Sequence, residues 1–559
     1  MSTPDFGNAL DRLDQLKTQF GPKPAQRIVS LLRRIARLRI TDADLLLRLH
    51  ELLLFIRAYP HNPSVLKAAD EALLFIQTRV VHLRNSEVDL SGLEHPEVSG
   101  IAGTAVIDTF SYQIVCWLLR QRSAQVAFDW DWFEDQNRLA AAWPRFMPLL
   151  EEDSYVEASV PYREWLGYAR GSQDEVTWLL NQFSKLKKSD LQKAELYDAQ
   201  KLYVRWQFNY RDSRTGLRLP VKTNFYHETP LIQRRDVDLR AELTKPFTQL
   251  ERLSTREGRA AIDMALTAST VRYRELYGFT NGDPASVYKT ELGRGVELLI
   301  FTLPPAKRLP LRAYHSAMIY KNGVPVGYFE GLSLFERMES GFNLYYTFRE
   351  GETAWLYARV LSVMRNLTGV TAFSLDPYQI GHENEEGIQS GAFWFYRKLG
   401  FRSTQPSIQR LTEVEEAKML SRRNHRTSAA MLRRLAEAQM IFELDQTRRG
   451  DWDRFQIRNL GFALQRLMAR EFKGNVNLMR SHGLALAAKT LGLEGKSDIG
   501  DIAVILLLLD NLQAWSKEDL CLLRNIIETK RTGLESKYLR LLQKHVRLRD
   551  ELIKIGSGL

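Results

Sequence analysis

The chain has 559 residues, 44% of them hydrophobic and 26% charged, which is the composition of a globular protein and excludes a largely disordered one. This length exceeds what one hydrophobic core organises, so we expect about three domains. The formal net charge of +11 permits an anionic partner, and the longest apolar run, at 502–509, is far shorter than the roughly 20 residues of a membrane span.

The N-terminal region, residues 1–90, is predicted to be helical. Its first residues carry neither the basic start nor the apolar core of a secretory signal, so we expect a cytoplasmic protein without membrane insertion. Amphipathic periodicity predicts helices at 25–40, 43–57 and 65–81. The helix at 25–40 carries a basic strip that comprises Ser30, Arg33, Arg34, Arg37 and Arg39. Such a strip is typical of a solvated helix face. Alternatively, it forms a surface that binds the phosphates of nucleic acid.

Residues 91–246 are predicted to form a mainly helical region with one β-hairpin. A buried helix is expected at 101–120, and strands at 202–208 and 221–226 flank a turn. An acidic and aromatic run at 128–135 favours the start of a helix over a site for a hard cation, because the glycine-bearing calcium-loop spacing is missing. Cys116 and Cys521 lie in apolar runs typical of buried free thiols. No metal site is predicted.

Residues 247–412 alternate between strand and helix patterns. Strands are predicted at 247–254, 296–303, 313–321, 324–335, 343–348 and 370–375, and helices at 255–277, 284–292 and 353–366. Asn322-Gly323 is the strongest short hairpin signal, and it joins two of these strands. The helix 353–366 lies between two strands, which fits parallel neighbours joined by a crossover. A last helix carries Ala392 and Tyr396 and ends at Gly400.

The run from Ala392 to Phe401, AFWFYRKLGF, resembles the late helix of the N-acetyltransferase (GNAT) superfamily, whose pattern is roughly A-x-x-x-Y-x-K-x-G-F. The order of elements over 247–412 is also similar to that family. The resemblance implies a mixed α/β sheet in which the fourth and fifth strands are parallel and splay apart. It also implies acyl transfer to an amine at that opening, with an acyl-CoA such as acetyl-CoA as donor. The amine would belong to a small molecule or a peptide.

The donor loop departs from the family pattern, which is Q/R-x-x-G-x-G/A. Here the loop reads REGETA at 349–354, so one glycine remains and two carboxylates are added. Backbone N–H groups at a helix N-terminus suit a phosphate, whereas carboxylates repel it. The resemblance assigns donor binding to Arg349, Gly351, Thr353 and Ala354, together with Gln389 in place of the usual asparagine.

The same resemblance assigns the general acid of acyl transfer to Tyr396. An amine acceptor also needs a base, and the candidates are carboxylates and a histidine near the opening. Glu330 and Glu336 share one face of a regular strand, and His382 and Glu383 lie in the polar loop 376–387 that leaves the carboxyl end of a strand. The loop is alternatively a solvated acidic segment.

Residues 413–559 are predicted to form a basic, all-helical C-terminal domain. The chain as a whole is therefore expected to be α+β and multidomain, with a central GNAT-like sheet between helical flanks.

Three functions follow from these patterns. The first is an N-acyltransferase, the second a non-catalytic GNAT-fold binding or scaffold protein, and the third a basic regulatory protein associated with nucleic acid.

Overall fold

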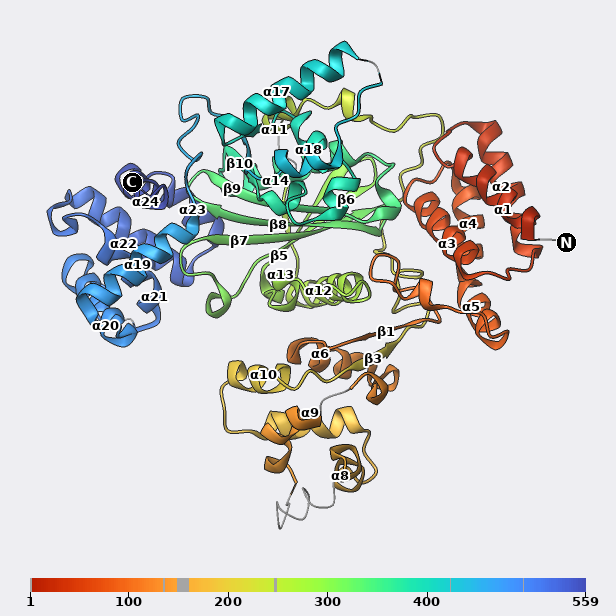
Figure 1. The fold of residues 1–559 in the computed structure, drawn as a ribbon, viewed down its shortest axis with the longest axis horizontal. Helices are drawn as coiled ribbons and strands as arrows, with labels where there is room; N and C mark the ends of the chain where they lie inside the picture. The colour runs from red at the N-terminus through yellow and green to blue at the C-terminus, as the bar shows by residue number, and fades with distance from the viewer. Residues whose placement is uncertain are drawn as a thin grey trace. The chain divides into compact units, whose positions relative to one another are not determined.

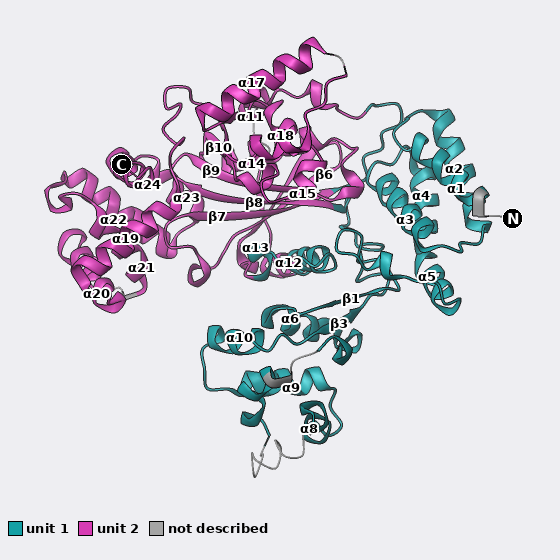
Figure 2. Cartoon of the chain, viewed as in Figure 1, with its two compact units in different colours: residues 1–230, 260–280, 321–325 teal, residues 231–259, 281–320, 326–559 magenta. Residues whose placement is uncertain are grey.

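A computed structural model describes residues 3–133, 136–147, 160–245, 249–422, 424–495 and 497–558. The fold is α+β (Figure 1), and the chain divides into two compact units (Figure 2). Unit 1 comprises Met1–Pro230, Ala260–Thr280 and Lys321–Pro325, and unit 2 comprises Leu231–Arg259, Asn281–Tyr320 and Val326–Leu559. Each unit is described by itself below.

Unit 1 begins with five helices, and the expected helices at 25–40 and 43–57 are confirmed as the second and third of them, while the first was not predicted. Asp42 and Asn62 cap the third and fourth, because their side chains accept hydrogen bonds from backbone N–H groups three residues on. The expected helix at 65–81 is divided near Phe75 into two helices. The five are α1 (Thr3–Leu16), α2 (Pro22–Arg37), α3 (Ala43–Ala58), α4 (Pro63–Leu74) and α5 (Ile76–Asn85).

The rest of unit 1 contains a three-stranded antiparallel sheet with the order β1-β3-β2, where β1 is Ala105–Asp108, β2 is Val126–Phe128 and β3 is Val204–Gln207. The expected helix at 101–120 was wrong in its first half, where β1 lies. The expected hairpin was wrong as well, because β3 pairs with β1 and β2 while 221–226 forms no strand. The other described helices of unit 1 are α6 (Tyr112–Arg122), α8 (Tyr162–Ala169), α9 (Glu175–Lys185), α10 (Asp190–Asp198) and α13 (Tyr277–Thr280), together with most of α12 (Thr255–Thr270).

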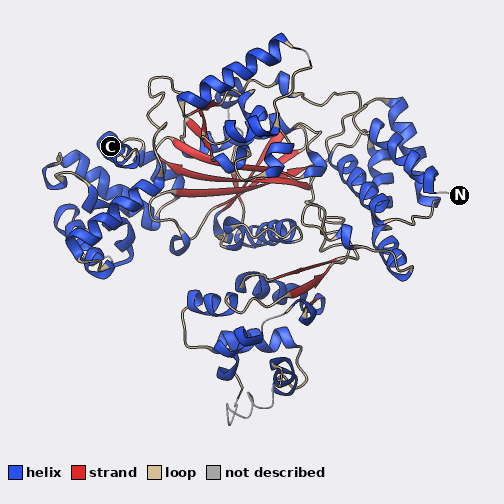
Figure 3. Ribbon diagram, viewed as in Figure 1, coloured by secondary structure: helices blue, strands red, loops and turns tan. Residues whose placement is uncertain are grey.

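Unit 2 is built on a nine-stranded mixed sheet, shown in Figure 3, with the order β11-β12-β10-β9-β8-β7-β6-β5-β4. The hairpin signal Asn322-Gly323 is confirmed, since it joins two long neighbouring strands. The strands are β4 (Glu251–Arg252), β5 (Val287–Gly293), β6 (Val296–Phe301), β7 (Ala313–Lys321), β8 (Val324–Leu334), β9 (Arg337–Leu344), β10 (Ala372–Leu375), β11 (Arg402–Ser403) and β12 (Met440–Glu443).

Three expectations for this region are corrected. The expected helix 284–292 is a single 3₁₀ turn followed by β5, whose residues pair along β6. The expected strand 343–348 begins earlier, at Arg337, and ends at Leu344. The segment expected to be all helical after 412 contains β12, which is fully buried and lies between β10 and β11. Of the expected strand 247–254, residues 247 and 248 lie outside the described residues, and β4 occupies 251–252.

The crossover helix α14 (Thr353–Thr368) joins β9 to β10 and is buried along most of its length. Its C-terminus is closed by Gly369 in the left-handed conformation, with φ of 82°. α11 packs against α14. The other described helices of unit 2 up to residue 435 are α11 (Leu239–Thr244), α15 (Glu385–Gln389), α16 (Ala392–Arg397), α17 (Pro406–Ser421) and α18 (Ala429–Leu435), together with the first residues of α12 (Thr255–Thr270).

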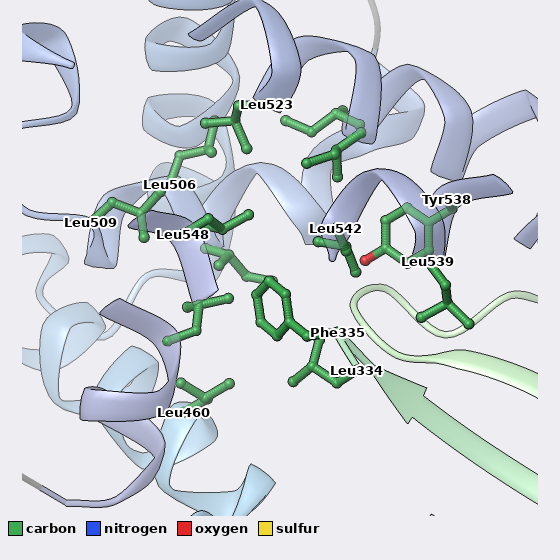
Figure 4. Close-up of a cluster of buried hydrophobic side chains, with 14 of the residues drawn as sticks. Leu334, Phe335, Leu460, Leu506, Leu509, Leu523, Tyr538, Leu539, Leu542 and Leu548 are labelled. Atoms are coloured by element: carbon green, nitrogen blue, oxygen red, sulfur yellow. The ribbon is translucent and has the colours of Figure 1, made fainter. Parts of the chain in front are cut away.

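The C-terminal helices share one hydrophobic core with the end of the β8–β9 turn. Leu334 and Phe335 in that turn lie beside Leu542 and Leu548 of the helices (Figure 4). The helical segment is thus part of the same packed unit as the sheet. Its helices are α19 (Ile457–Phe472), α20 (Val476–Leu491), α21 (Gly500–Ala503), α22 (Lys517–Thr532), α23 (Glu535–Leu542) and α24 (Val546–Gly556).

Candidate functional site: a cleft where two parallel strands separate

β9 and β10 are parallel neighbours over a short distance only. The paired residues run from Arg337 and Ala372 to Glu339 and Ser374, after which β10 ends at Leu375. β9 continues to Leu344, with β8 as its partner along the whole length. The two parallel strands therefore separate at their carboxyl ends, which is where ligands bind in open α/β sheets.

A cavity of about 210 Å³ lies at this separation. Glu330 of β8 stands on its wall, opposite Gly341 of β9 in the strand register. The hydroxyl of Tyr314 donates a hydrogen bond to the Glu330 carboxylate. Burial raises the pKa of Glu330 above its ordinary value, and the hydrogen bond from Tyr314 lowers it in part. Glu330 is thus a partly buried carboxylate on the cavity wall, and its surroundings favour the protonated form more than water does.

Two further cavities adjoin the first one around Asp376, which directly follows β10. One, of about 480 Å³, is lined by His382 and Glu383, so the structure brings both predicted loop residues to the cleft region. The other, of about 280 Å³, is lined by Arg337. Asp376 lines all three cavities, which we call the groove; its lining reaches from Arg337, at the start of β9, past Asp376 to His382.

Tyr396 is buried behind this groove rather than on its wall, with 3% of its surface exposed. The carboxamide of Gln379 lies between them, donating to the Tyr396 phenol oxygen at 3.2 Å and to the Phe342 carbonyl of β9 at 2.9 Å. Burial raises the pKa of Tyr396 far above its ordinary value. In this conformation a ligand in the cleft meets Gln379 before it meets the tyrosine.

Glu336 is placed away from the cleft. It lies in the turn after β8 and accepts hydrogen bonds from Trp452 Nε1 at 2.9 Å and from the Arg549 guanidinium. Burial raises the pKa of Glu336, but the hydrogen bonds and charge of Arg549 outweigh burial and hold it below its ordinary value. Glu336 lines none of the three cavities, and its arrangement is that of a structural ion pair.

The predicted donor loop is closed by its own side chains. Arg349 forms an ion pair with Glu386 of α15, and the N–H of Gly351 donates to the Phe348 carbonyl at 2.9 Å. Thr353 Oγ1 donates to the Arg349 carbonyl at 3.0 Å. The fully buried Glu352 carboxylate, at the N-cap of α14, pairs with Arg294 at 2.5 Å.

The remaining donor-loop predictions are Ala354 and Gln389. Ala354 is buried in the first turn of α14, while Gln389 is exposed at the end of α15. A phosphate that binds Arg349 competes with Glu386 for its guanidinium. The loop as folded therefore does not by itself form an open phosphate site.

Sequence reasoning did not single out several groups of the groove, among them Tyr314, Arg337, Asp376 and Gln379. A signal existed for two of them. Asp376 ends a buried strand directly, and Arg337 is a charged residue between two buried strands, both of which mark functional positions in α/β sheets. The positions of Tyr314 and Gln379 depend on tertiary packing, which leaves no local pattern.

The basic strip of residues 30–39 lines a separate groove in unit 1. This groove, of about 860 Å³, is bordered by Arg33, Arg34 and Arg37 of α2 and by Asn62 and Ser64 at the start of α4. Arg34 also pairs with Asp5. The strip's role in nucleic-acid binding stays a prediction.

Comparison of the chain with models of known protein families, with curated proteins and with solved structures finds no match. Among the described residues no helix has the length and apolarity that crossing a bilayer requires. Within the same residues, no cluster of three or more histidine, cysteine or acidic side chains is arranged to hold a metal ion.

Proposed function

We propose that unit 2 is an N-acyltransferase that moves an acyl group from a thioester donor to an amine in the cleft between β9 and β10. The observation that carries the proposal is Glu330, a partly buried carboxylate with a raised pKa at the point where the two parallel strands separate. The likeness of residues 392–401 to the late GNAT helix supports the same reaction.

The reaction needs one proton acceptor and one proton donor. The amine nitrogen attacks the thioester carbonyl, a C–N bond forms, the C–S bond breaks, and the sulfur leaves as a thiolate. Glu330 takes the proton that the amine loses, and its raised pKa makes it a stronger base than an exposed carboxylate. Tyr396 supplies the proton for the thiolate once Gln379 has moved aside. In the structure the Gln379 carboxamide is hydrogen-bonded to the Tyr396 hydroxyl and separates it from the cleft.

The donor binds along the exposed edge of β9, and its phosphates compete with Glu386 for Arg349. An ion pair between partly exposed side chains contributes only about 0–1 kcal/mol, so a multiply charged phosphate can replace it. The carboxylate of Glu352 does not oppose this exchange strongly, because Arg294 already neutralises it.

A non-catalytic binding protein is the second candidate. The closed donor loop and the Gln379 carboxamide in the gap favour it, because both fill places that an acyl donor needs. The two candidates differ in one measurable outcome, which is turnover.

Chromatographic detection of free CoA and of acylated amine tests the proposal. The full chain is incubated with acetyl-CoA or longer acyl-CoAs and a set of amines. We expect product formation that falls by about 10²- to 10⁴-fold in Glu330→Gln, the usual contribution of a general base. Glu471→Gln, which changes an exposed carboxylate outside the groove, serves as the matched control. Absence of turnover with every donor and amine would leave the binding role as the better account.

A further inference from the structure

The 860 Å³ groove of unit 1, bordered by α2 and the start of α4 and called the basic groove below, is lined by cations and neutral groups. Its charged lining consists of Arg33, Arg34 and Arg37, all on α2, and Asn62 and Ser64 border it at the start of α4. α2 packs against α4. Within the described chain, no aspartate or glutamate belongs to this lining. The basic groove therefore carries a net positive charge at neutral pH.

α2 supplies charge that the rest of unit 1 compensates only in part. The helix carries five lysines and arginines and no acidic residue. Arg34 pairs with Asp5. Arg33 and Arg37 are exposed, and neither forms a hydrogen bond or an ion pair with any other described residue. They are four residues apart on one helix face, where like charges repel, so their placement disfavours the helix and favours an external anion.

The apolar face of α2 is already covered, which argues against a lipid partner. Ile28, Leu32 and Ile35 are buried in the core of unit 1. A basic helix that binds a bilayer surface inserts its apolar face among the lipids, and this face of α2 is not available for that. The cations of the basic groove thus suit an anion that stays in water.

The exposure of the arginines selects the kind of anion. An exposed arginine gains little from a single anion, because water and salt screen the pair. A polymer with a dense row of phosphates differs, since each phosphate that a protein neutralises releases condensed counterions and adds to the affinity. A nucleic-acid duplex has the density required, with one charge for about every 1.7 Å of helix axis in DNA.

The neutral side chains of the basic groove favour a duplex over a single strand. No aromatic residue occurs in the lining as the structure describes it. Proteins that bind single strands stack the bases on aromatic rings. Contacts to a duplex backbone come from arginine and from serine and asparagine, and the lining offers Ser30, Asn62 and Ser64 beside its arginines.

We propose that the basic groove binds the phosphate backbone of a nucleic-acid duplex without reading its sequence. Arg33 and Arg37 pair with phosphate oxygens, and the hydroxyl groups of Ser30 and Ser64 donate hydrogen bonds to the same backbone. This inference concerns unit 1 and is independent of the reaction proposed for unit 2.

Fluorescence anisotropy of a labelled duplex of about 20 base pairs, as DNA and as RNA, titrated with the full chain, tests the inference. We expect saturable binding that weakens with salt. Neutralisation of about three phosphates predicts a slope of about −2.7 for log K against log salt, which is about 40-fold between 50 and 200 mM. Absence of binding to both duplexes at 50 mM salt would overturn the inference, as would tighter binding of a single strand of the same sequence.

A double variant identifies the surface involved. Arg33→Gln with Arg37→Gln removes two phosphate contacts, so the slope should become shallower by about 1.8 and the affinity at 50 mM salt should fall by at least about tenfold. Arg12→Gln with Arg27→Gln is the matched control, because it removes the same charge from exposed positions outside the lining. An equal effect of the two double variants would assign binding to the net charge of the protein and overturn the inference.

Sedimentation with vesicles of phosphatidylcholine and phosphatidylserine separates a nucleic acid from a membrane surface. We expect the Arg33 and Arg37 variant to lose duplex binding and to leave any vesicle binding unchanged. Loss of vesicle binding with duplex binding intact would reject the duplex and make an anionic lipid surface the partner of the basic groove.

Discussion

The carboxamide of Gln379 donates a hydrogen bond to the phenol oxygen of Tyr396, at 3.2 Å, and a second one to the Phe342 carbonyl of β9, at 2.9 Å. One side chain thus bridges the edge of a strand and the residue that the sequence pattern assigns as the acid. The backbone carbonyl that Gln379 satisfies belongs to the part of β9 beyond its pairing with β10. Gln379 therefore takes the position that an extended ligand along β9 would occupy.

Shortening Gln379 is predicted to open the path to Tyr396. In Gln379→Ala the Tyr396 hydroxyl and the β9 edge become accessible. If Gln379 must move during the reaction of the native protein, the variant no longer needs that movement, so the KM for the acyl donor falls several-fold. Steady-state kinetics with acetyl-CoA measure this. Tyr396→Phe is the matched variant, in which Gln379 keeps its bond to Phe342, and it is expected to lower kcat with little change in KM. A large loss of kcat in Gln379→Ala would instead make Gln379 a participant.

The pH dependence of transfer is predicted to follow Glu330. The general base must be ionised, so the rate falls as pH falls through the pKa of Glu330. Tyr314 donates to the charged carboxylate and lowers this pKa, which burial otherwise raises. Removing the hydroxyl in Tyr314→Phe raises the pKa further and shifts the rising limb of the rate profile to higher pH. Initial rates between pH 4 and 9 test the shift, and an unchanged limb would exclude Glu330 as the titrating group.

The affinity for an anionic donor is predicted to depend on the pair formed by Arg349 and Glu386. Glu386→Gln leaves Arg349 available to phosphate, so acyl-CoA should bind more tightly by a few-fold, consistent with about 0–1 kcal/mol for the pair. Arg349→Glu should abolish the binding. Calorimetry measures both. Glu385→Gln is the control, because Glu385 lies on the same helix and pairs with Arg433 instead. An equal gain in acyl-CoA affinity in both variants would assign the effect to the net charge of the protein rather than to Arg349.

The sheet was predictable where the signals are local. The strands on either side of Asn322-Gly323 were predicted within one residue of their observed ends, because a two-residue turn fixes the register of its neighbours. The start of α14 at Thr353 and the end of β10 at Leu375 were also predicted. These elements have hydrophobic patterns long enough to distinguish helix from strand.

The errors share a different cause, which is pairing between distant segments. β12 is four residues long and follows a basic helical stretch, and only its fit between β10 and β11 makes it a strand. The same holds in unit 1, where β3 pairs with strands about a hundred residues earlier in the chain rather than with the segment after its turn. In the site, the sequence offered Glu330 and Glu336 as alternatives together with the polar loop 376–387, and it gave no signal for the contacts of Gln379, which are set by side-chain packing.

The buried pair formed by Glu336 and Arg549 is predicted to hold the sheet to the C-terminal helices of unit 2. The two residues are 7% and 4% exposed, and Arg549 also pairs with Asp451 at 2.9 Å. Glu336→Ala leaves the guanidinium only partly compensated and is expected to cost about 3 kcal/mol of the free energy of unfolding. Replacing both partners in Glu336→Leu with Arg549→Met should cost less than the sum of the single changes. Denaturant unfolding of Glu336→Ala, of Glu336→Leu, of Arg549→Met and of the double variant tests this, and strict additivity would show that the pair is not coupled.

The stability of unit 1 is predicted to fall in mild acid because of His50. This side chain is fully buried beside Thr215 and Glu51, and burial lowers its pKa from 6.5 to about 4. Between these two values the unfolded chain binds a proton that the folded chain does not. The stabilisation is therefore complete above pH 6.5 and is lost as pH falls toward 4, by about 3 kcal/mol in full, at 1.36 kcal/mol per pKa unit. His50→Gln, which keeps a polar group without this titration, should flatten the dependence. Denaturant unfolding of both proteins at pH 7.0 and 4.5 measures it, and equal acid sensitivity in the two would assign the effect to other groups.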